Sequence, residues 1–306
     1  MHERQKHRVQ RILADIRSPR RKKVIVDTDA YNEMDDQFSI LYALCASSKM
    51  EVLAVNAAPF YNDRSGSFGD GMVKSYEEIR RLTACLPDGD SIPVFHGSRA
   101  SIESTSHPAP SPAAENIISE ALASDEVLYI LTLGAVTNVS SALLMEPKIA
   151  EKICVIWLGG TELGKPDVRE FNLAQDYAAG QVLLNSGCTV LLCPAFDVTC
   201  VLTAGFDELT SLDGVNAHGT YLAALTREFF EAAGSPEHWT RVIWDIAAPA
   251  ILDNPDCAEL EIVTAPVFTD SFTYASDKTR HDMILLKKLD RDAVFKGCFD
   301  ALRKGR

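Results

Sequence analysis

The chain has 306 residues, of which 30 are Lys or Arg and 43 are Asp or Glu, so its formal net charge is −13. This length permits one large domain or two small ones and allows a core that needs no disulfides. An acidic chain is a poor match for nucleic acid, whose phosphates must be neutralised by basic side chains. It suits neutral or cationic substrates, or carboxylates gathered around a metal ion.

The first segment of the chain is basic. Residues 1–23 hold nine Lys or Arg and two Asp or Glu, whereas the remaining residues carry a formal charge of −20. We expect this segment to form a surface helix that ends at Ser18-Pro19, because a helix is disfavoured at the residue before a proline. The helix is either solvated or docked on the acidic body or on another subunit. The sequence thus predicts a basic segment over 1–23 and one domain over 24–306.

From residue 24 onward, short apolar runs alternate with amphipathic stretches. The predicted strands are 24–26, 52–56, 92–95, 127–133, 153–158 and 189–193, and the predicted helices between them are 36–47, 71–86, 112–123, 137–145 and 175–186. After residue 200 we expect helices over 216–233 and 241–252, β-like runs over 260–268 and 283–286, and a final helix from about Asp290. Strands that are apolar on successive residues and separated by helices are typical of a parallel sheet covered on both faces. We therefore predict a single α/β domain with an open, mostly parallel sheet flanked by helices around a Rossmann-like core.

Cysteine usage and hydropathy bear on the compartment. The eight cysteines form no C-x-x-C pair, and several lie in apolar runs, so we expect buried, reduced thiols rather than disulfides or a zinc site. No apolar run approaches the roughly 20 residues of a membrane span, and the N-terminus has no apolar signal-peptide core. We expect a cytoplasmic protein with no membrane partner.

The sharpest feature of the sequence is the run VIVDTDAYNEMDD at residues 24–36, which holds four aspartates directly after the first predicted strand. In an open parallel sheet, ligands bind outside the carboxyl ends of the strands, which is where this run lies. Taken alone, Asp35 or Asp36 could be a helix N-cap or a charge favoured by the helix dipole. Four carboxylates close together repel one another unless a cation is present, so the set predicts a site for Ca²⁺ or Mg²⁺.

This run resembles the Asp-rich loop D-x-D-P-G-x-D-D of the nucleoside hydrolases, Ca²⁺-dependent enzymes that cleave the N-glycosidic bond of ribonucleosides. Asp27-Thr-Asp29 and Asp35-Asp36 match its two halves, and the residues between them make the loop two residues longer. Four further segments are similar in order and spacing: LGAVTN at 133–138 to G-P-L-T-N, WLGG at 157–160 to M-G-G, EFNLAQDYAA at 170–179 to E-F-N-x-x-x-D-P-x-A-A, and WDIA at 244–247 to H-D-x-x-A. The resemblance covers about residues 24–300 and implies a nucleoside hydrolase-like fold.

The resemblance also implies a Ca²⁺ site and a mechanism. The ligands would be Asp29, Asp36, Asp245 and the backbone carbonyl of Leu133. A water and two ribose hydroxyls would complete the about six to eight oxygens that Ca²⁺ takes. The water, acidified by the metal, would give its proton to Asp29 as general base and attack the anomeric carbon. Asp27 would orient the loop from behind these ligands.

A second implied set of residues binds the nucleoside. It comprises Asn32, Asp35, Leu158, Glu170, Asn172 and Trp244. Asp35, Glu170 and Asn172 would hold ribose hydroxyls, and carboxylates near the sugar favour the positive charge that develops as the bond breaks. Simpler explanations exist for single residues: Glu170 could pair with Arg169 at the surface, Asn172 could cap a helix, and Asp245 could start one.

One departure from the family pattern concerns the leaving group. Many members place a His immediately before the late Asp to protonate the departing base, and this chain has Trp244, whose indole N–H is no useful acid. A subset of purine-preferring members has Trp here and stacks the base on it. We therefore predict a Trp-lined base pocket and a preference for purine nucleosides, with core packing as the alternative for Trp244. The inserted residues Tyr31-Asn32-Glu33 lie at the predicted mouth, where Asn32 would contact the sugar.

Two other functions remain open at this point. Asp27-Thr-Asp29 also resembles the D-x-D of haloacid-dehalogenase-like phosphatases, but that motif needs Thr or Val where this chain has Tyr31. The second alternative is a non-catalytic relative that binds nucleosides or metal without turnover, which the longer loop and the missing His favour. Retention of every proposed Ca²⁺ ligand favours an enzyme. The family resemblance further implies a small-molecule ribonucleoside as partner and a homodimer or homotetramer.

Overall fold

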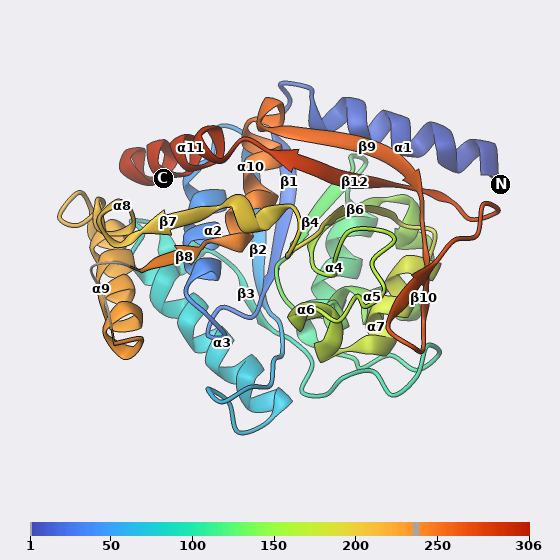
Figure 1. Ribbon diagram of the computed structural model, residues 1–306, viewed down its shortest axis with the longest axis horizontal. Helices are drawn as coiled ribbons and strands as arrows, with labels where there is room; N and C mark the ends of the chain where they lie inside the picture. The colour runs from blue at the N-terminus through green and yellow to red at the C-terminus, as the bar shows by residue number, and fades with distance from the viewer. Residues whose placement is uncertain (1, 235–238) are drawn as a thin grey trace.

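A computed structural model describes residues 2–234 and 239–306 of the chain. Its centre is an eight-stranded sheet with the order β3-β2-β1-β4-β5-β6-β12-β9 (Figure 1). These strands are β1 (Lys22–Thr28), β2 (Met50–Ala57), β3 (Val94–His96), β4 (Leu128–Thr132), β5 (Ile153–Leu158), β6 (Thr189–Cys193), β9 (Ala258–Thr264) and β12 (Asp282–Leu289). Neighbours run parallel, except that β9 is antiparallel to β12. The predicted fold class, a single α/β domain with an open, mostly parallel sheet, is confirmed.

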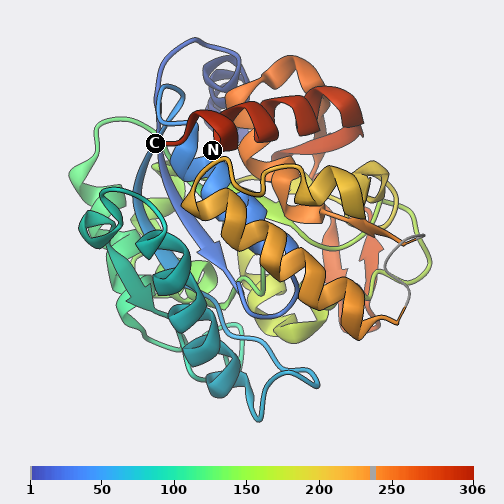
Figure 2. The same ribbon diagram turned by 90° about the vertical axis from the view of Figure 1, so that its left-hand side faces the viewer.

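Helices cover both faces of this sheet. The main ones are α2 (Asp35–Cys45), α3 (Phe68–Ala84), α4 (Pro112–Ala123), α5 (Thr137–Met145), α6 (Phe171–Gln175), α7 (Tyr177–Asn185), α8 (Phe206–Thr210), α9 (Ala217–Ala232), α10 (Ala247–Asp253) and α11 (Arg291–Lys304). Val24 and Val26 of β1 pack in one apolar cluster with α2, α10 and α11, whereas Ile25 packs in a second cluster with α4, α5 and α7. Figure 2 shows the first face, where α2, α9 and α11 pack against one another. Because β4, β5 and β6 are buried along their whole length, their sequences are apolar on successive residues.

The basic N-terminal segment forms α1 (His2–Ile16), which lies along β12 and β6 (Figure 1). Its buried apolar residues are Val9, Ile12 and Ile16. Just inside its C-terminal end, Asp15 accepts a hydrogen bond from the Tyr129 hydroxyl of β4 at 2.7 Å. A solvated helix is therefore the wrong reading of this segment, and docking on the body of the protein is the right one. The helix ends at Ile16, two residues before the expected stop, and β1 begins at Lys22.

Packing of α1 on the sheet predicts a stability effect. We expect Ile12→Ala to lower the free energy of unfolding by about 2–5 kcal/mol, because it removes buried methyl groups and leaves a cavity. Urea denaturation would measure the change. Gln10→Ala, at an exposed position of the same helix, is the matched control and should leave the stability within about 0.5 kcal/mol of the wild type. Equal stability of the two variants would contradict a structural role for α1.

Two predicted elements are wrong in detail, and a third has shifted bounds. The helix expected over 175–186 is α7, which begins at Tyr177 because the Asp176 carboxylate accepts the Ala179 N–H at 3.1 Å and caps the helix. The short helix α6 before it was not predicted. The helix expected over 241–252 consists of β8 (Thr240–Val242), the short 3-10 helix η5 (Trp244–Ile246) and α10, and β8 pairs with β7 (Thr203–Gly205). The run expected over 260–268 is divided between β9 and a hairpin of β10 (Val267–Thr269) and β11 (Thr273–Ala275). Such short elements contain too few residues for a hydrophobic period to show.

The cysteines are in the state that the sequence predicts. All eight cysteines are free, and six of them are buried. No helix in the described part of the chain is long and apolar enough to cross a bilayer.

Candidate active site

A pocket opens at the carboxyl edge of the sheet, where the segments after β1, β4, β5 and β6 meet. Its lining residues are Asp29, Asn32, Glu33, Asp35, Asp36, Leu133, Leu158, Glu170, Phe171, Asn172, Ala195, Phe196, Trp244 and Asp245. Every residue that we predicted to bind metal or nucleoside is in this set, and Asp27 alone lies behind it. The roles assigned to these residues stay predictions, but the fold brings them together from distant parts of the chain.

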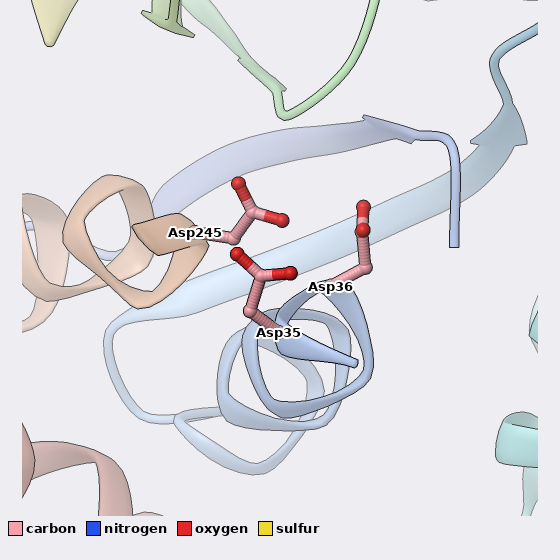
Figure 3. A group of neighbouring side chains, drawn as sticks. All are labelled: Asp35, Asp36 and Asp245. Atoms are coloured by element: carbon pink, nitrogen blue, oxygen red, sulfur yellow. The ribbon is translucent and has the colours of Figure 1, made fainter. Parts of the chain in front are cut away.

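Three buried carboxylates form the tightest group in the pocket. One oxygen from each of Asp35, Asp36 and Asp245 lies within 4.8 Å of the other two. Figure 3 shows Asp35 and Asp36 projecting from the first turn of α2 and Asp245 reaching toward them from η5. The carboxylate of Asp29, also buried, lines the same pocket. Asp35, which the resemblance assigns to the sugar, is therefore a further candidate metal ligand.

Burial raises the pKa of every carboxyl group in this cluster. The pKa of Asp36 rises to about 7. The pKa values of Asp35 and Asp245 rise well above the usual range, because repulsion between neighbouring carboxylates adds to the effect of burial. Burial and the charge of Asp36 raise the pKa of Asp29 in the same way. Without a compensating cation, protons would occupy part of the cluster at neutral pH.

The donor set fits a hard divalent cation. Two buried oxygens, Asp29 Oδ2 and Asp245 Oδ1, accept no hydrogen bond from any residue that the structure describes. The described residues that line the pocket include no lysine, arginine or histidine. Carboxylate and carbonyl oxygens are the ligands that Ca²⁺ and Mg²⁺ prefer. A bound cation would therefore offset the repulsion that the fold itself leaves uncompensated.

The turn after β4 borders the pocket beside Asp29. A Cβ at position Gly134 would lie 2.6 Å from Asp29 Oδ1, so only glycine allows the backbone to approach this carboxylate so closely. The side-chain amide of Asn172 donates to the carbonyl of Leu133 at 2.7 Å and to that of Leu158 at 3.1 Å. Asn172 therefore holds together the two strand ends whose carbonyls face the pocket.

Glu170 is buried at the start of α6, where it is the N-cap. Its carboxylate accepts three backbone N–H groups, those of Gly160 (2.7 Å), Asn172 (2.9 Å) and Leu173 (3.1 Å). The surface ion pair with Arg169 is the wrong alternative, since Arg169 pairs with Asp167 at 2.7 Å. Helix capping by Asn172 is also wrong, because Glu170 takes that position. Asp245 does start a helical segment, η5, and lines the pocket as well.

Asp27 lies on β1, fully buried behind the pocket. The amide of Asn138 donates to Asp27 Oδ2 at 3.0 Å, and its oxygen accepts the Ser98 N–H at 2.9 Å. Burial raises the pKa of Asp27 to about 7. This placement agrees with an orienting role, which stays a prediction.

Two aromatic rings also line the pocket. Trp244 and Phe196 meet edge to face, with their ring centroids 6.1 Å apart at an interplanar angle of 88°. Trp244 is half-buried, packs partly against the core and also lines the pocket, and its contact with a base stays a prediction. Three further lining residues, Phe171, Ala195 and Phe196, were not predicted from the sequence. Phe171 lies inside the EFN segment, a signal that could have indicated it.

The inserted residues 31–33 lie at the pocket and are held by contacts to other segments. The Asn62 amide donates to Asn32 Oδ1 at 2.6 Å. Glu33 forms an ion pair with Arg241 of β8. Both Asn32 and Glu33 line the pocket. The longer loop is therefore an ordered part of the pocket wall, although contact between Asn32 and a sugar stays a prediction.

The raised pKa values predict how the metal-free protein responds to pH. Asp27 and Asp36 have pKa values of about 7 in the folded state, above the 3.8 of an unperturbed aspartate, so between about pH 4 and pH 7 the folded state binds more protons than the unfolded state. The stability of the metal-free protein should therefore fall as the pH rises through this range. Urea denaturation in EDTA at each pH would measure the slope. Asp36→Asn should flatten it, and a stability that rises with pH in both proteins would contradict the prediction.

Comparisons with known proteins agree with this geometry. The family model described as inosine-uridine preferring nucleoside hydrolase matches residues 24–296. RihC, a non-specific ribonucleoside hydrolase of Klebsiella pneumoniae subsp. pneumoniae, is 26% identical over 163 residues, so the match spans only 52% of either protein. Two solved structures share the fold. A purine-preferring ribonucleoside hydrolase from Gardnerella vaginalis has a TM-score of 0.73 at 20% identity and covers 92% of this chain and 98% of its own. A plant nucleoside hydrolase, PpNRh1, has a TM-score of 0.71 at 19% identity and covers 93% and 99%.

The family match covers residues 24–296, most of the chain, and it sets aside the phosphohydrolase alternative. The chain belongs to the inosine-uridine preferring nucleoside hydrolase family, whose members are hydrolases that act on nucleosides.

Proposed function

We propose that this protein hydrolyses the N-glycosidic bond of ribonucleosides, preferentially purine nucleosides, to the free base and ribose, and that it depends on Ca²⁺. The observation that carries the proposal is the composition of the pocket. It combines four buried aspartates with two aromatic rings. A ribonucleoside has the same two halves, a polyhydroxylated sugar and a planar base.

The carboxylate end would hold the cation. Its ligands are proposed to be Asp29, Asp36, Asp245 and the Leu133 carbonyl. When bound, Ca²⁺ supplies positive charge that acidifies water and orients vicinal hydroxyls. The position of Asp35 inside the carboxylate cluster supports its proposed contact with a ribose hydroxyl beside the cation.

Side chains of the protein would carry out the remaining steps. Asp29 accepts the proton of the attacking water, a role favoured by its free buried oxygen. Asn32, Glu170 and Asn172 hold the sugar hydroxyls, while Leu158 contacts the apolar face of the ribose. As the bond to the base breaks, the carboxylates stabilise the positive charge that develops on the sugar. Trp244 stacks on the base, which leaves with the electron pair of the broken bond and takes a proton from solvent.

A product assay tests the proposal. Inosine, adenosine, guanosine, uridine and cytidine are incubated with the protein, with and without EDTA, and release of the free base is measured. We expect release in Ca²⁺, fastest for the purine nucleosides, and none in EDTA. Binding of Ca²⁺ and nucleoside without release of any base would instead indicate the non-catalytic alternative.

Localisation and assembly belong to the same proposal. The free, mostly buried cysteines support a cytoplasmic protein. A homodimer or homotetramer is proposed on the family resemblance alone, and light scattering during gel filtration would measure the mass of the assembly.

A further inference from the structure

Phe196 is a large apolar side chain that the fold leaves unburied. It follows β6, and 54% of its surface is exposed, whereas Ala195 beside it is almost fully buried. Both residues line the pocket. A phenylalanine exposed in a pocket carries apolar surface that a ligand can remove from water.

The turn that carries Phe196 is held on both sides. The Ala195 N–H donates to the Gly160 carbonyl at 3.1 Å. On the other side, Asp197 pairs with Lys165 at 2.7 Å and accepts the Glu162 N–H at 3.3 Å. These contacts bind the turn to the segment after β5, so the backbone that carries Phe196 is held in place.

Phe196 and Trp244 together form an aromatic corner. Their rings are nearly perpendicular, at 88°, so a planar group lying on the face of one ring meets the other at its edge. Such edge-to-face arrangements are favoured between aromatic rings. The polar lining residues come from the aspartate loop, from the start of α6 and from η5, where Asp245 directly follows Trp244. Within the corner, Phe196 contributes no donor or acceptor side chain and Trp244 only its indole N–H, so the corner would recognise a base mainly by its apolar area.

We propose that Phe196 is a specificity-determining residue that contacts the nucleobase together with Trp244 and favours bicyclic purines over monocyclic pyrimidines. The inference rests on the proposed function, because it assumes that the aspartate end holds the ribose. A bicyclic base covers more of the two rings than a monocyclic base does, and the gain follows the apolar area removed from water.

Kinetics of three variants test the proposal. Phe196→Ala should lower kcat/KM for inosine by about 10- to 50-fold, the range expected for loss of one stacking partner, and kcat/KM for uridine by less than about threefold. Phe196→Tyr keeps the ring and should retain the wild-type preference. Leu122→Ala is the matched control, since Leu122 is an exposed apolar residue of α4 that does not line the pocket. An equal loss for both substrates in Phe196→Ala, or no loss for either, would overturn the proposal.

A binding measurement separates this inference from the proposed function. Formycin B and pseudouridine carry a bicyclic and a monocyclic base on a C-glycosidic bond, which hydrolysis does not cleave. Calorimetric titration of the Ca²⁺-loaded protein should show tighter binding of formycin B, and Phe196→Ala should lose that preference. If the wild type turns over nucleosides and Phe196→Ala keeps the preference, only the role of Phe196 is wrong. If neither compound binds and no nucleoside is hydrolysed, the proposed function is wrong and the inference falls with it.

Discussion

Asp29→Asn should lower kcat/KM for inosine by at least about 10³-fold, while the variant folds normally. The proposed role of Asp29 is to accept a proton from water, and loss of a general base typically costs about 10²- to 10⁴-fold. Asparagine has nearly the same shape but no basic oxygen, and it also weakens the proposed cation site. Steady-state kinetics with saturating Ca²⁺ would measure the loss.

The same substitution should make the metal-free protein more stable. Asp29 is buried, its Oδ2 accepts no hydrogen bond from a described residue, and burial together with Asp36 raises its pKa. Removing that charge in EDTA at pH 8 relieves repulsion, so Tm should rise by a few degrees. A functional residue that destabilises the fold is expected where a binding site collects like charges.

A surface substitution provides the control for Asp29→Asn. Asp90→Asn removes a carboxylate whose side chain is 98% exposed, and it should change neither activity nor stability measurably. An active, metal-loaded Asp29→Asn protein would remove Asp29 as the base. Loss of activity together with loss of folding would show that the side chain is structural.

Removal of the metal should abolish activity, and Ca²⁺ should restore it. The protein gathers carboxylates whose pKa values are raised by burial and mutual repulsion, and no cationic side chain lines the pocket among the described residues. At a free Ca²⁺ concentration of about 100 times Kd, binding stabilises the fold by about 2.7 kcal/mol. For a chain of 306 residues that corresponds to a rise in Tm of roughly 4 °C.

The Ca²⁺-dependent rise in Tm measures binding of the cation independently of activity. Asp245→Asn removes a buried carboxylate of the cluster and should reduce the Ca²⁺-dependent shift, whereas Asp90→Asn should keep it. Full activity in a protein shown by elemental analysis to contain no divalent metal would contradict the proposed dependence.

Much of the sheet could be predicted because a strand buried on both faces is a run of consecutive, mostly apolar residues. The runs at 127–133, 153–158 and 189–193 are apolar except for Thr132 and Thr189, and each contains a buried central strand. The N-terminal helix was harder, since its Lys and Arg residues dominate the composition while three apolar positions, Val9, Ile12 and Ile16, bind it to the core. Net charge describes the exposed face of such a helix and gives no information on its buried one.

Some residues of the candidate site could also be predicted from the sequence, and others could not. Asp29, Asp35 and Asp36 lie within one short run, so their density alone indicated a cation site. Asp245 could be joined to them only through the family resemblance, since nothing local to the segment 244–247 predicts that η5 turns toward α2. Phe196 had no signal at all, because an apolar residue after a buried strand reads as core. Its exposure depends on how the turn is held by Gly160, Glu162 and Lys165.

The stoichiometry of the products from inosine, in phosphate-free buffer with Ca²⁺, tests directly whether water cleaves the glycosidic bond. We expect hypoxanthine and free, reducing ribose in equal amounts, because water is the nucleophile. Absence of both products in Ca²⁺-loaded protein would contradict it. So would cleavage that appears only when phosphate is added, since the sugar would then leave as a phosphate ester.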